Sequence, residues 1–74
     1  MRAIKIMRVD GSVVTPITEV PAATTREILV WALHWRQGHQ RRGAEIMPMP
    51  NGMQAYTRET GRLDFFYTED PAVQ

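Results

Sequence analysis

The chain has 74 residues, a formal net charge of +1 and no cysteine. This length supports a single domain, near the lower size at which a hydrophobic core suffices without disulfides or a structural metal. The absence of cysteine excludes disulfides and thiolate chemistry, and the small net charge gives no general attraction to nucleic acid or membranes. The sequence shows no secretory leader pattern and no apolar run long enough to span a bilayer, so we expect a cytoplasmic protein.

The N-terminal segment is predicted to form a β-hairpin. Residues 2–9 alternate as a strand does, and the dipeptide Asp10-Gly11 is a strong signal for a two-residue hairpin turn. Pro16 falls at a hydrogen-bonded position of this ladder, so we expect a bulge or an edge strand there, and Pro21 is expected to end the strand. The cleaner core face of this hairpin consists of Ile4, Ile6, Val13 and Ile17.

The stretch from Thr24 to Arg42 is the one convincing helix of the sequence. Thr24 and Glu27 have the spacing of a capping box, which satisfies free N–H groups at a helix start. Either Gly38 or Gly43 can end the helix in the left-handed conformation. The apolar arc of the helix consists of Ile28, Leu29, Trp31, Ala32, Leu33 and Trp35.

The aromatic side chains of this helix have two interpretations. Trp31 and Trp35 share one face, where large aromatics most simply form core, although one of them could instead lie at a protein interface. Val30 is the apolar residue that the pattern leaves on the solvent side. His34 is expected to be solvated and His39 partly packed.

The C-terminal half is predicted to add three strands. A short strand over residues 44–49 precedes a hairpin of residues 53–58 and 62–68. We expect a three-residue loop, Glu59-Thr60-Gly61, with its glycine in the left-handed bulge position. Residues 69–74 are expected to fray. This register puts on the core face Met53, Ala55, Leu63, Phe65 and Tyr67.

The element order ββαβββ predicts an α+β fold, with a single antiparallel sheet of four or five strands and one amphipathic helix packed on one face. One helix covers only one face, so the other face is free to contact another molecule. Aromatics interleaved with arginines suit base stacking and phosphate contact, and they are equally typical of protein interfaces. The predicted open face consists of Lys5, Met7, Val9, Val14, Gln54, Tyr56, Arg58, Arg62, Asp64 and Phe66.

The basic connector over residues 36–42 is a second candidate contact site. Its arginines either complement the negative end of the helix dipole or contact phosphate or an acidic surface. From this connector and the predicted open face we expect the following partner-binding residues: Lys5, Tyr56, Arg58, Arg62, Phe66, Arg36, Arg41 and Arg42.

No catalytic, metal or cofactor site is indicated by the sequence. The single serine, Ser12, lies in a predicted turn with no histidine nearby, and the two histidines do not converge on one side of the helix. The carboxylates are scattered, and there is no phosphate-binding glycine loop. We therefore expect neither enzymatic activity nor a bound metal or cofactor.

One stretch suggests a relationship to known proteins: Asn51-Gly52, Ala55-Tyr56 and Glu59-Thr60-Gly61, followed by an aromatic strand. Together with the element order, it resembles very small phage-encoded inhibitors, notably certain type I-F anti-CRISPR proteins. The resemblance implies a non-enzymatic protein that binds a nucleic-acid-handling complex and blocks it.

Three functional hypotheses follow from the sequence. The first is a non-catalytic binding protein whose partner is a protein or a ribonucleoprotein. The second is a direct nucleic-acid-binding module that uses Tyr56, Arg58, Arg62 and Phe66. The third is a structural homodimer formed through the open face or a sheet edge.

Overall fold

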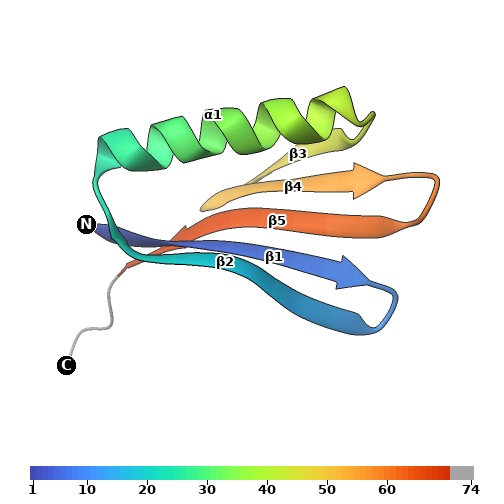
Figure 1. Cartoon of the computed structure of the whole chain (residues 1–74), viewed down its shortest axis with the longest axis horizontal. Helices are drawn as coiled ribbons and strands as arrows, with labels where there is room; N and C mark the ends of the chain where they lie inside the picture. The colour runs from blue at the N-terminus through green and yellow to red at the C-terminus, as the bar shows by residue number, and fades with distance from the viewer. Residues whose placement is uncertain (71–74) are drawn as a thin grey trace.

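The computed structural model describes residues 1–70, which form one antiparallel sheet with one helix on one of its faces (Figure 1). In chain order the elements are β1 (Arg2–Asp10), β2 (Val13–Ala23), α1 (Thr25–Arg41), β3 (Glu45–Met49), β4 (Gly52–Thr57) and β5 (Arg62–Glu69). The strands are arranged β2-β1-β5-β4-β3, so the first and last strands of the chain are neighbours in the sheet. The predicted α+β fold and ββαβββ order are confirmed.

Helix α1 begins at the predicted capping box. The Thr24 hydroxyl accepts a hydrogen bond from the Glu27 backbone N–H at 3.2 Å, and the Glu27 carboxylate accepts one from the Thr24 N–H at 3.0 Å. These two bonds satisfy N–H groups that have no partner inside the helix, and they place a carboxylate at the positive end of its dipole.

Gly43, rather than Gly38, ends the helix. Gly43 has a φ of +83°, which glycine adopts without steric cost. Its N–H donates to the carbonyl of Gln40 at 3.0 Å, and the N–H of Ala44 donates to that of His39 at 3.1 Å. This pair of bonds is a Schellman motif, and Gly38 lies inside α1.

The β1–β2 hairpin turns one residue later than predicted. Asp10 pairs with Val13, so the turn is Gly11-Ser12. The expected bulge is present, because the register shifts between Met7, which pairs with Pro16, and Ile6, which pairs with Thr18. Both Val13 and Ile17 are exposed, so their predicted core positions are wrong.

Strand β2 also continues past Pro21 to Ala23, where the prediction ended it. A second register shift, between Arg2 and Ile4 of the facing strand, accommodates this proline. Strand β2 is an edge strand with two irregularities, and edge strands and bulges are the places in a sheet where proline is tolerated.

The β4–β5 connection determines which face β5 presents. Thr57 pairs with Arg62, so the loop has four residues rather than three, and the Gly61 N–H closes it on the Thr57 carbonyl at 2.8 Å. Gly61 has the expected positive φ, but Arg58 has left the strand for the loop. A shift of one residue moves every side chain to the opposite face. The predicted faces are therefore exchanged for Arg62, Leu63, Asp64, Phe65, Phe66 and Tyr67.

The core lies between the sheet and a narrow stripe of α1. It consists of Ile4, Ile6, Ala23 and Phe66, with Val20, Ile28, Ala32, Trp35 and Met53 packed against it. Ala55 is also buried, as predicted. Leu29, Trp31 and Leu33 were predicted on the buried arc, but they are 65%, 38% and 44% exposed. Of the predicted frayed tail, Glu69 belongs to β5, and residues 71–74 lie outside the described residues.

Candidate functional site

The sheet face turned away from α1, here called the open face, carries three rows of side chains. Directly opposed residues of antiparallel strands share a face, so the register defines each row. The first row, from β2 to β3, is Val14, Val9, Leu63, Tyr56 and Glu45. The second row is Pro16, Met7, Phe65, Gln54 and Met47. The third row is Glu19, Lys5, Tyr67, Gly52 and Met49.

The first two rows are mainly apolar. At their centre, Met7, Val9, Leu63 and Phe65 are half-buried by one another and by the strands beside them. At one edge Val14 is 60% exposed. Helix α1 lies on the other side of the sheet, and no other helix occurs among residues 1–70 (Figure 1). The open face is therefore an apolar surface without a second layer, which is a feature of interaction sites.

The basic groups at the open face are paired with carboxylates. Lys5 Nζ lies 2.7 Å from Glu19 Oε1 and 3.9 Å from Glu69 Oε2, and the hydrogen bond to Glu19 raises the pKa of Lys5. At the margin of the face, Arg58 Nη2 lies 2.9 Å from Glu45 Oε1. These exposed pairs contribute little stability, but they leave this face with little net positive charge.

A buried polar cluster lies on the helix side of the sheet around Asp64. The Arg8 Nε donates to Asp64 Oδ1 at 3.0 Å, and Arg62 Nε lies 3.4 Å from Oδ2. His39 Nδ1 lies 3.9 Å from the same Oδ2, and the Asp64 side chain is only 3% exposed. Asp64 therefore holds two guanidinium groups beneath the C-terminal end of α1.

His39 is packed between this cluster and Trp35, with the two ring centroids 4.4 Å apart. Burial is the largest cause that lowers the pKa of His39. The charge of Asp64 raises this pKa, and the charges of the nearby arginines lower it. The imidazole is therefore disposed to remain neutral inside the fold.

The predicted partner-binding residues do not form one site. Lys5 and Tyr56 lie on the open face, and Arg58 lies in the loop beside it. Arg62 lies on the helix side against Asp64, and Phe66 is 2% exposed in the core, so their predicted positions on the open face are wrong. The physical cause is the fourth residue of the β4–β5 loop, which exchanges the two faces of β5.

The predicted basic connector forms part of α1. Arg36 and Arg41 are exposed on the helix, and Arg42 is its C-cap residue. Arg42 lines a shallow hollow together with Glu45 and Arg58 at the margin of the open face, whereas Arg36 and Arg41 lie on α1 away from it.

The prediction missed Leu63, Phe65 and Tyr67 as members of the open face. Their alternation is visible in the sequence, and the three-residue loop predicted over Glu59-Thr60-Gly61 placed it on the core face. Only the length of the β4–β5 loop distinguishes the two assignments.

The comparisons with known proteins give no relative: neither the family models, nor the curated proteins, nor the solved structures include a match. Helix α1, the helix of residues 1–70, is not long and apolar enough to cross a membrane. Among those same residues, no group of three or more His, Cys, Asp or Glu side chains could hold a metal ion.

Proposed function

We propose that this protein is a non-enzymatic binding protein whose open face docks on another protein, either free or as part of a ribonucleoprotein. The single observation that supports this is the orientation of β5. The strand turns Leu63, Phe65 and Tyr67 to the open face, and it turns Asp64 and Thr68 toward the helix together with Phe66. An antiparallel sheet with one solvated face normally has the opposite arrangement.

The chemistry of the open face favours a protein partner over a nucleic acid. Tyrosine, phenylalanine and methionine are enriched in protein interfaces, and this face presents all three. Phosphate contact requires unpaired cations, but Lys5 and Arg58 each lie beside a carboxylate and Arg62 lies on the opposite face. Nucleic-acid binding is therefore the second candidate.

The face, rather than an edge of the sheet, is the surface that this proposal assigns to the partner. A partner strand could add only to β2 or β3, the two edge strands. Strand β2 contains Pro16 and Pro21, and β3 contains Pro48. Proline lacks the N–H that such an addition needs, and it commonly protects sheet edges.

The resemblance to phage-encoded inhibitors suggests a more specific role within this proposal. A chain with an apolar contact face and no enzymatic activity could inhibit a nucleic-acid-handling complex by occupying a surface that the complex needs. Tyr56 belongs both to the stretch that carries the resemblance and to the open face.

Site-specific crosslinking in cells that carry the gene tests the proposal. A photoreactive phenylalanine at position 56 or 65 should crosslink one and the same protein, because both positions lie on the open face. The same group at exposed Gln40 of α1 is the matched control and should not crosslink it. Met7→Glu should abolish the crosslinks while leaving the melting temperature within about 5 °C, since Met7 has no layer above it.

Two outcomes contradict the proposal. One is an identical set of crosslinked proteins from positions 40, 56 and 65. The other is retention on heparin that weakens by orders of magnitude between about 50 and 200 mM salt and is lost in Arg58→Glu, which would support direct nucleic-acid binding instead.

A further inference from the structure

A pocket lies between α1 and the β3–β4 part of the sheet, and Figure 1 shows α1 running beside these two strands. Ile28, Ala32 and Arg36 are spaced four residues apart, so they follow one another along a single flank of α1, and all three line the pocket. Its volume is about 380 Å³. A cavity of about 150 Å³ holds a benzene-sized molecule, so this pocket has the size of a small-molecule site.

The walls of this pocket are mainly apolar. Between Ile28 and Arg36 the helix contributes only the methyl group of Ala32. The sheet contributes Pro48 and Met53, which pair with each other across β3 and β4. Met53 pairs in turn with Phe66, so the pocket reaches down to the core. Walls of this kind favour a ligand with an apolar or aromatic body.

Arg36 is the only charged residue among residues 1–70 that lines the pocket. The polar groups of Asn51 and Thr68 at the pocket bond to each other. Asn51 Nδ2 donates to the Thr68 carbonyl at 3.1 Å, and Thr68 Oγ1 donates to the Asn51 carbonyl at 3.4 Å. Arg36, by contrast, forms no ion pair with any of residues 1–70. Its guanidinium can therefore bind a carboxylate, which matches its geometry with two parallel hydrogen bonds.

We propose that this pocket binds a small apolar or aromatic monocarboxylate. The body of the ligand lies against Met53 and Phe66, and its carboxylate lies at Arg36. The pocket is on the helix side of the sheet, opposite the open face, so this inference does not rest on the proposed protein-docking function.

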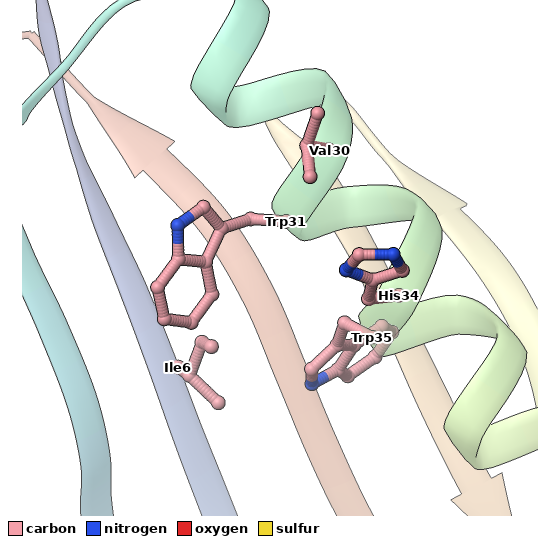
Figure 2. Close-up of a pocket in the computed structure, with 5 residues that line it drawn as sticks. All are labelled: Ile6, Val30, Trp31, His34 and Trp35. Atoms are coloured by element: carbon pink, nitrogen blue, oxygen red, sulfur yellow. The ribbon is translucent and has the colours of Figure 1, made fainter.

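A second apolar hollow, of about 350 Å³, lies on the other flank of α1. Figure 2 shows the indoles of Trp31 and Trp35 reaching from α1 over the sheet there, with Ile6 of β1 beside them. This hollow is also apolar, but no arginine or lysine of residues 1–70 lines it. It is therefore an internal comparison: a ligand that needs only apolar surface would bind in both places, whereas a carboxylate would prefer the pocket at Arg36.

Titration of the ¹⁵N-labelled full chain with naphthylacetate, followed by the chemical shifts of the backbone amides, tests this inference. The largest shifts should occur in β3, in β4 and on the Arg36 flank of α1. The dissociation constant should be about 1 mM or below, as expected for a ligand of this size. Naphthylacetamide has nearly the same shape without the charge, and it should bind at least about 10-fold more weakly.

Three variants separate the role of the charge from that of the apolar walls. Arg36→Gln should weaken the binding of naphthylacetate at least about 10-fold and leave that of naphthylacetamide unchanged. Arg41→Gln removes the same charge from an exposed position of α1 outside the pocket, and it should leave both affinities unchanged. Ala32→Leu places a larger side chain of good helix propensity in the pocket, so it should abolish the binding of both compounds without unfolding the chain.

Five outcomes overturn the inference. Naphthylacetate could cause no shifts at concentrations up to about 5 mM, it could bind no more tightly than naphthylacetamide, or its largest shifts could surround Trp31. Naphthylacetate could also bind Arg36→Gln as tightly as the wild type. Finally, it could bind with unchanged affinity to an Ala32→Leu variant that melts at the wild-type temperature.

Discussion

At the scale of single residues, the buried carboxylate of Asp64 organises the polar part of the helix side. Its two oxygens are placed near Arg8 and Arg62, and both arginine side chains still reach solvent. Burying an ion pair requires that both charges lose their water. Removing one partner is strongly destabilising, because the remaining buried charge then has no opposite charge beside it. The carboxylate is therefore a structural requirement of this corner of the fold.

His39 makes the stability of the protein depend on pH. Its pKa in the folded chain is lowered by burial, so below the unfolded-state value of about 6.5 the unfolded chain binds a proton that the folded chain does not. The free energy of unfolding should therefore have its full value above pH 6.5. Below pH 6.5 it should fall by at most about 1.4 kcal/mol per pH unit. Urea denaturation at pH 7.5, 6.5 and 5.5 measures this slope.

The matched variants for this prediction are His39→Gln and His34→Gln. His39→Gln should flatten the dependence between pH 7.5 and 5.5, whereas replacement of exposed His34 on the same helix should preserve it. Glu27 does not interfere, because its pKa is lowered from 4.5 and its contribution is lost only at more acidic pH. An unchanged slope in His39→Gln would show that another group causes it.

At the scale of the elements, the caps of α1 set its length. Thr24→Ala removes the hydroxyl that accepts from Glu27, and the loss should cost about 1 kcal/mol. For a domain of this size that corresponds to a fall in melting temperature of about 4–8 °C. Thr25→Ala is the control, because Thr25 is the first helical residue and makes no such hydrogen bond. Equal melting temperatures for the two variants would contradict the role of the capping box.

The elements also show what the sequence could predict. The helix start, the bulge at Pro16 and the positive φ of Gly61 follow from chemistry within a few residues, and these predictions are confirmed. The register of β5 changes when the β4–β5 loop gains or loses one residue. Each of the two sets of alternate residues in β5 contains a phenylalanine, so either set could face the core. Local preference could not decide between Phe65 and Phe66, because the deciding contact is the packing of Phe66 against Trp35, whose ring centroid lies 5.8 Å away.

The sequence predicted that the sheet has an open face, but it predicted only some of the residues on that face. That one helix leaves one face of the sheet free follows from the count of elements, and it is confirmed. Tyr56, Lys5 and Met7 were placed on that face correctly. The helix side differs from the prediction, because a narrow buried stripe leaves Leu29, Trp31 and Leu33 exposed. The sequence pattern alone does not reveal that the helix is narrower than the sheet it packs against.

At the scale of the whole molecule, one face of the sheet forms the core and the other is open. The two adjacent phenylalanines of β5 lie on different faces. Phe66→Ala removes the largest side chain of the core and should cost about 3–5 kcal/mol. A domain of this length has a total stability of about 4–11 kcal/mol, so this variant should be partly or fully unfolded. Phe65→Ala removes the same atoms from a side chain that only its own sheet covers, so its cost should be less than half as large.

Urea denaturation of the two alanine variants measures the difference, with Phe66→Leu as a milder replacement that keeps the core apolar. We expect Phe65→Ala to remain folded and to lose the partner crosslink at position 56, since both residues belong to the open face. Phe66→Leu should retain that crosslink at a reduced melting temperature. The reverse order of stabilities would place Phe65 beneath α1 and restore the three-residue loop. In that case β5 would turn its apolar alternation inward, and the open face would lose the residues on which the proposed contact depends.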